Sequence, residues 1–171
     1  MRLALFLLVV TVSLFIAGRL LARRVGGEVS RRFLETKTDY TNDSLRTWIS
    51  KHEREAKWYA FPILVPVDLL FMVFLAALLA LASVALAGQI GALREHAWLF
   101  TALPALYLAA DLAEDALLVR FLFAPEAIGP AMVRCTQVLT KVKIWSVKSA
   151  ALQTAALLVA VFIIDRCGRR G

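Results

Sequence analysis

The sequence predicts an all-α, polytopic membrane protein: four transmembrane helices in a bundle, with an amphipathic helix at the cytoplasmic face. Three observations favour this fold class. Of the 171 residues, 60% are hydrophobic and 19% are charged, whereas a soluble domain is about 45–50% apolar and about 25% charged. The mean hydropathy is +0.71. The apolar residues also gather in long runs that lack the alternation of a barrel strand. This composition excludes an ordinary soluble enzyme, a disordered chain and a disulfide-stapled secreted module.

Four apolar runs are long enough to cross a bilayer, because about 20 apolar residues span about 30 Å of hydrocarbon. They cover residues 3–22, 61–87, 97–123 and 144–164, within a single membrane domain of residues 1–171. The first run resembles a signal peptide in its charge and apolarity. We expect it to be an uncleaved span, since it lacks a small-x-small cleavage site and is long for a signal sequence.

The distribution of Lys and Arg predicts the orientation. Ten lie between the first and second runs when Arg19 at the end of the first is included, and four lie between the third and fourth when Arg120 is included, against five on the opposite side. Both termini are therefore expected outside, with residues 23–60 and 124–143 in the cytoplasm, as in a bacterial inner-membrane protein. The net charge of +7 then reflects membrane orientation rather than a nucleic-acid surface. Cys135 and Cys167 are expected on opposite sides, which excludes a disulfide between them.

The cytoplasmic segment 23–60 contains a predicted amphipathic helix over residues 44–60, capped by Asp43. Apolar side chains recur along it at helical spacing, with charged residues on the other side. The helix is expected either to lie in the headgroup layer or to pack on the bundle, and the pattern fits both. The residues expected to anchor to anionic lipid headgroups are Arg19, Arg23, Arg24, Arg31, Arg32, Trp48 and Trp58.

Charged residues inside the apolar runs form the candidate site. At about 100° per residue, Asp111, Glu114 and Asp115 share one face of a helix. Such groups face protein or water, because an ionisable group facing lipid costs at least about 2.5–3.5 kcal/mol. Estimated depths place Glu114 and Asp115 in the cytoplasmic half, level with Asp68 and with the intramembrane cation Lys148, and Asp111 near the midplane. The predicted polar cluster comprises Asp68, Tyr107, Asp111, Glu114, Asp115 and Lys148.

Three functions fit this pattern. With no P-loop, dinucleotide fingerprint or nucleophile elbow in the sequence, we expect a non-catalytic membrane subunit, assembly or accessory factor, whose cluster holds the bundle or binds a partner. The alternative is a proton- or cation-coupled transporter that uses the carboxylates. A second alternative is a metal-dependent intramembrane enzyme acting on lipid, since carboxylates suit Mg²⁺ or Mn²⁺. Expected partners are the bilayer and a membrane protein or a second copy of the chain. No cofactor is expected beyond a divalent cation.

Overall fold

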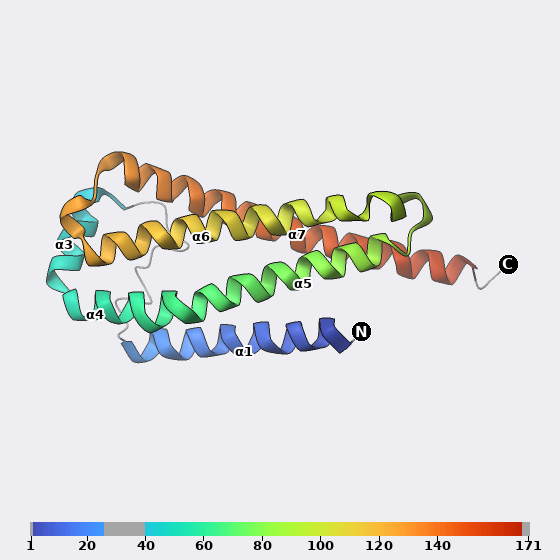
Figure 1. Ribbon diagram of the computed structural model, residues 1–171, viewed down its shortest axis with the longest axis horizontal. Coiled ribbons are helices and arrows are strands. Elements are labelled where there is room, and N and C mark those ends of the chain that lie inside the picture. The colour runs from blue at the N-terminus through green and yellow to red at the C-terminus, as the bar shows by residue number, and fades with distance from the viewer. Residues whose placement is uncertain (1, 26–39, 169–171) are drawn as a thin grey trace.

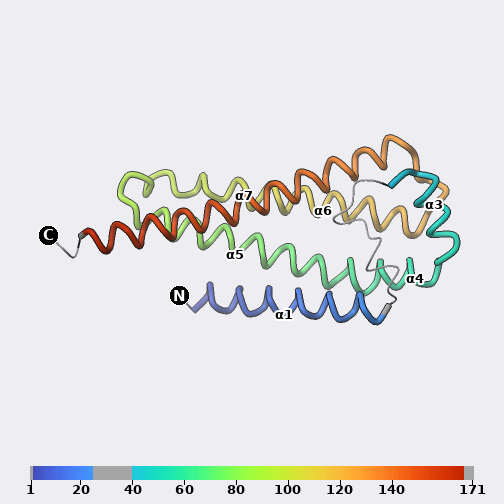
Figure 2. The backbone as a smooth tube through the Cα atoms, turned by 180° about the vertical axis from the view of Figure 1, so that it is seen from behind, coloured from blue at the N-terminus to red at the C-terminus, as the bar shows by residue number. Residues whose placement is uncertain are grey.

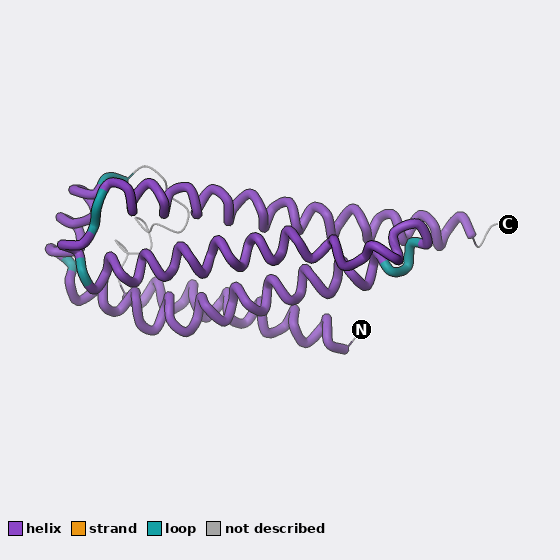
Figure 3. Tube along the Cα trace, turned by 45° about the horizontal axis from the view of Figure 1, so that its top comes forward, coloured by secondary structure: helices purple, strands orange, loops and turns teal. Residues whose placement is uncertain are grey.

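The computed structural model describes residues 2–25 and 40–168, which are almost entirely helical (Figure 1). The long helices lie side by side along one axis, and three views agree on this arrangement (Figures 1, 2 and 3). Both ends of the chain lie at one end of the bundle, and α3 and α4 lie at the other. The helices are α1 (Arg2–Val25), α3 (Asn42–Lys51), α4 (Glu53–Trp58), α5 (Leu69–Ala87), α6 (Ala102–Phe123) and α7 (Pro130–Gly168).

Within residues 2–25 and 40–168, three helical stretches are long and apolar enough to cross a membrane. They are Arg2–Arg24, Glu53–Ala87 and Pro130–Cys167, so the chain has the composition of a helical membrane protein. The remaining long helix, α6, has 22 residues, or about 33 Å at 1.5 Å per residue. Its length suffices for a span, but three buried acids, Asp111, Glu114 and Asp115, interrupt its apolar sequence.

Helix α1 packs along α5 and leaves its outer face uncovered. The rings of Phe15 and Phe71 are 6.0 Å apart, and those of Phe6 and Phe74 are 6.5 Å apart. The close approach at Gly18 leaves a Cβ at that position 3.6 Å from Val67. Helix α1 exposes many large apolar side chains, among them Phe6 and Phe15 beside α5, which suits contact with lipid. They are Leu3, Leu5, Phe6, Leu8, Val9, Val12, Phe15, Ile16 and Leu20.

The predicted amphipathic helix 44–60 divides into α3 and α4, which are separated at His52. The predicted cap, Asp43, is wrong. Thr41 caps α3 instead: its hydroxyl accepts from the Ser44 amide at 3.2 Å, and the Thr41 amide donates to the Ser44 hydroxyl at 2.9 Å. This reciprocal pair is a capping box in which Ser44 takes the place usually held by Glu or Gln. With this cap, α3 begins at Asn42, two residues before the predicted start of the amphipathic helix.

Two prolines shift the start of the second long helix toward the C-terminus. The segment Tyr59–Asp68 (η1) contains wide helical turns interrupted at Phe61 and Val65, whose φ/ψ values are −140°/120° and −124°/113°. Each of these residues precedes a proline, and the proline ring pushes its predecessor out of the helical region. Regular α-helix therefore begins at Leu69, not at residue 61 as predicted.

The third and fourth predicted runs also differ in their boundaries. A 3₁₀ helix, η2 (Gly91–Thr101), precedes α6, so the α-helix begins at Ala102 rather than at residue 97. After a short 3₁₀ turn, η3 (Pro125–Ala127), α7 runs unbroken for 39 residues, about 58 Å. Part of the loop expected at 124–143 is thus continuous with the fourth run. Pro130 suits the first turn of α7, where no amide donor is needed.

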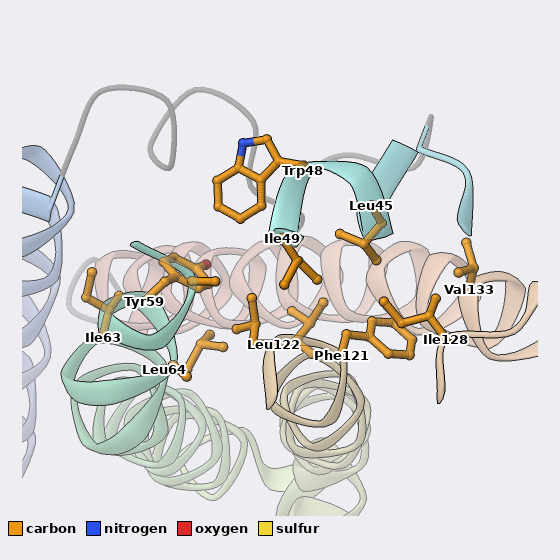
Figure 4. Close-up of a cluster of buried hydrophobic side chains, with 13 residues drawn as sticks. Leu45, Trp48, Ile49, Tyr59, Ile63, Leu64, Phe121, Leu122, Ile128 and Val133 are labelled. Carbon is orange, nitrogen blue, oxygen red and sulfur yellow. The ribbon is translucent and has the colours of Figure 1, made fainter. Parts of the chain in front are cut away.

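The largest hydrophobic cluster lies at the α3–α4 end of the bundle (Figure 4). Leu45 and Ile49 of α3 pack toward Phe121 and Leu122 of α6. The guanidinium of Arg46 fixes α3 there by donating to the backbone carbonyls of Glu126, at 3.0 Å, and Ile128. The apolar face of α3 is therefore covered by protein.

Candidate functional site

The centre of the site is a lysine held between two acids on the neighbouring helix. Lys143 Nζ lies 2.8 Å from Asp111 Oδ1 and 2.5 Å from Glu114 Oε2. All three side chains are buried, and they join α6 to α7. Burying a lysine and a carboxylate is tolerated when each charge meets an opposite one at this distance.

Thr140, one turn before Lys143 on α7, adds a hydroxyl to the site. It hydrogen-bonds Oε1 of Glu114 and lies 2.9 Å from the backbone carbonyl of Thr136. A hydroxyl has one proton to donate, so the two contacts share it. Glu114, with no exposed surface, therefore meets α7 through both of its oxygens.

Three aspartates form the other side of the cluster. Each of Asp68, Asp111 and Asp115 offers one carboxylate oxygen, and these oxygens lie within 4.8 Å of one another. Asp68, which ends η1, is half-buried, whereas the other two are buried. The Tyr107 phenol hydrogen-bonds Asp111 from the preceding turn of α6. Oxygen donors at this spacing are those that Mg²⁺, Mn²⁺ or Ca²⁺ accepts, so these aspartates could hold a divalent cation.

Four carboxylates, those of Asp68, Asp111, Glu114 and Asp115, gather in the cluster. Lys143 pairs with two of them, Asp111 and Glu114, and Asp68 and Asp115 also have interaction partners.

Lys148, the expected cation of the cluster, lies elsewhere. Its side chain is exposed, whereas Lys143 is 8% exposed. Five residues of α-helix turn through about 500°, which leaves the two lysines about 140° apart around α7. Lys143 shares the buried face with Ser146 and Ala150. Its spacing from Ser146 and Ala150, three and seven residues, could have identified it from the sequence.

Tyr40 belongs to the site but lies outside the predicted set. Its hydroxyl is buried, and its backbone carbonyl accepts a hydrogen bond from Gln137 Nε2 at 2.8 Å. Burial and the nearby Glu114 carboxylate raise the pKa of the Tyr40 phenol to about 12, against the opposing effect of Lys143. Nothing in the polar sequence around Tyr40 predicts that it reaches α6 and α7.

The predicted headgroup anchors differ in how far the structure exposes them. Arg19, Arg23, Arg24 and Trp58 are exposed, as an anchor requires. Trp48 is 8% exposed and stacks on His52 with ring centroids 5.2 Å apart, so its expected place in the headgroups is wrong. Arg31 and Arg32 lie outside the described residues.

A second polar contact joins the helices farther along the bundle. Ser83 Oγ of α5 lies 2.8 Å from Thr154 Oγ1 of α7. Gln153 Nε2 donates to Ser83 Oγ at 3.2 Å and to the Phe100 carbonyl at 2.8 Å. These neutral hydrogen bonds tie α7 to α5 and η2.

Comparison of the chain with protein-family models, with curated proteins and with solved structures found no match.

Proposed function

We propose that this chain is a small non-catalytic membrane protein, a subunit, assembly or accessory factor, with four spans. In this proposal the end of η2 together with α6 forms the fourth span, with the acids of α6 turned toward α5 and α7. The arrangement of the helices supports it: α1, α5, α6 and α7 run along one axis, and both termini lie at one end. With the excess of Lys and Arg at the α3–α4 end, the orientation rule puts that end in the cytoplasm and the termini outside, as in a bacterial inner membrane.

The cluster then lies near the cytoplasmic edge of the hydrocarbon layer. Helix α5 has 19 residues, or about 28 Å, nearly the thickness of that layer. Asp68 immediately precedes α5. Gly18, next to Arg19, approaches Val67, next to Asp68, so an exposed arginine of α1 marks the same level. With the cluster at this depth, α3 packs on the bundle on the cytoplasmic side of the headgroups.

The observation that carries this proposal is the Lys143 bridge. Its Nζ contacts Asp111 at 2.8 Å and Glu114 at 2.5 Å, so one residue of α7 fixes two turns of α6. Polar contacts between membrane helices contribute about 0.6 kcal/mol each on average. Breaking an ion pair that bridges two acids away from water costs more stability, because it leaves a buried charge without its partner. The cluster thus serves as a clasp that sets the register of α6 on α7.

Two measurements on the full chain test this proposal. The first is purification in mild detergent followed by mass spectrometry, where an accessory factor is expected to carry other membrane subunits in fixed ratio. The second compares Asp111→Asn and Glu114→Gln with the parent protein in liposomes. A clasp predicts reduced folding stability with no change in proton or cation flux. Unchanged stability in both variants would contradict it.

A second candidate, proton- or cation-coupled transport, is favoured by the three aspartates whose oxygens lie within 4.8 Å of one another. Its test is flux into liposomes that contain the full chain. Asp68→Asn is expected to abolish the flux, because it removes the half-buried member of the group. The matched control is Asp165→Asn, which changes an exposed aspartate near the end of α7. Equal flux in the two variants and the parent would exclude transport through this group.

A further inference from the structure

Helix α7 has a second cationic feature, on the face opposite the clasp. Lys141, Trp145 and Lys148 are all exposed, and Trp145 has 61% of its surface uncovered. Their spacing of four and three residues places them on one side of the helix. The two lysines are seven residues apart, or about 10.5 Å along the axis. They flank the indole on either side.

The fold makes no use of these two charges. Within residues 2–25 and 40–168, neither Lys141 nor Lys148 forms an ion pair, whereas Lys143 between them forms two. The adjoining positions of this face are apolar, with Val138 57% exposed and Leu152 72% exposed, and the exposed Arg134 lies beyond Val138 toward the start of α7. A lysine among such residues extends its ammonium group toward the headgroups and covers apolar surface with its methylenes.

The level of this face along the bundle agrees with a headgroup position. Lys141 is two residues from Lys143, which meets the acids of α6 near the proposed cytoplasmic edge of the bilayer. Lys148 lies about 7.5 Å farther along α7 than Lys143, within reach of that edge for an extended lysine. Tryptophan favours the same interfacial layer.

We propose that Lys141, Trp145 and Lys148 form a binding site for an anionic phospholipid on the lipid-facing side of α7. The headgroup phosphate lies between the two ammonium groups, and the indole packs on the glycerol and upper acyl chains. The charge complementarity of two unpaired lysines on an apolar face carries this inference. It rests on the proposed membrane placement, and it names a lipid class for one face of the bundle.

The test uses Trp145 as a local reporter of lipid identity. The full chain, with its other tryptophans Trp48, Trp58 and Trp98 changed to Phe, is reconstituted into phosphatidylcholine vesicles. Brominated phosphatidylglycerol or brominated phosphatidylcholine is added at matched mole fraction, and quenching of Trp145 gives the relative affinity of each lipid. Circular dichroism verifies the helical content of each variant.

We expect brominated phosphatidylglycerol to be preferred by about fivefold for each lysine that contacts it. The double variant Lys141→Gln/Lys148→Gln is expected to lower the preference to about one, and Lys141→Arg/Lys148→Arg to retain it. A reporter chain that keeps only Trp98, which is exposed at the other end of the bundle, is the control and should show no preference.

Equal quenching of Trp145 by the two lipids would overturn the inference, as would a preference that survives removal of both lysines. The same preference at Trp98 would also overturn it, because the selectivity would then not belong to this face. Absence of quenching by either lipid would contradict the membrane placement itself. Failure of the underlying proposal is thus distinguishable from failure of the lipid site.

Discussion

Lys143 Nζ and Asp111 Oδ1 are 2.8 Å apart, and the helices that carry them run in opposite directions, joined only by a short turn. A second acid on the next turn of α6, Glu114, meets the same ammonium group. The pair therefore fixes both the rotation and the axial position of α7 on α6. Four expected outcomes follow from this contact and its surroundings.

Lys143→Met is expected to lower the free energy of unfolding by about 3–5 kcal/mol, because it leaves buried carboxylates without their cation. The measurement is reversible unfolding of the full chain in a neutral detergent. Lys148→Met, on the exposed face of the same helix, is the matched control and should change stability by no more than about 0.5 kcal/mol. Equal effects at the two positions would show that Lys143 does not carry the contact.

Thr140→Val is expected to cost about 1.5–3 kcal/mol, the range for a hydrogen bond to a charged group. The substitution preserves the shape of the side chain and removes the hydroxyl that meets Glu114. Thr47→Val, at an exposed position of α3, tests the general effect of this exchange in a helix. A double-mutant cycle with Glu114→Gln should show coupling for Thr140 and none for Thr47.

Arg46→Gln is expected to loosen α3 from the bundle, because it removes the donor to the Glu126 and Ile128 carbonyls. Hydrogen exchange measured by mass spectrometry should become faster in residues 42–51 and remain unchanged in α5. Arg54→Gln changes an exposed arginine of α4 and should leave α3 protected. Unchanged exchange in Arg46→Gln would mean that apolar packing alone holds this helix.

Tyr40 is expected to ionise at a pH of about 12, above the ordinary tyrosine pKa of 10.0. Its raised pKa favours the neutral phenol in the folded state. The resulting stability is fully present below pH about 10 and is lost as the pH rises through 12. The difference in absorbance at 295 nm between the parent and Tyr40→Phe gives this titration. A midpoint near pH 10 would contradict the burial of the phenol beside Glu114.

The sequence predicts the long helices and the buried acids well, because hydrophobicity and a helical period are local properties. Asp111, Glu114 and Asp115 are buried on α6 as their shared face requires. The cation could not be chosen on depth alone: Lys143 and Lys148 are about 7.5 Å apart along α7, a difference that a long lysine side chain can span, and their rotation around α7 decides which one is buried. Trp48 illustrates a similar limit of sequence analysis, because an amphipathic pattern does not reveal whether lipid or protein covers the apolar face.

The boundaries were less predictable for a different reason. Apolar composition continues through Phe61 and Val65, but the prolines after them set the local backbone, and α-helix resumes only at Leu69. Tyr40 could not be found because its position depends on the packing of α3 against α6, which involves residues far apart in the sequence.

The distribution of polar contacts has a consequence for the synthesis of this chain. Helix α1 is apolar throughout its middle, so it is stable in lipid as soon as it leaves the ribosome. Helix α6 emerges with three acids, and the lysine that neutralises two of them belongs to α7, which is made later. In the proposed four-span arrangement, α6 is therefore expected to remain with the insertion machinery until α7 follows, so that the last two helices enter the bilayer as a pair.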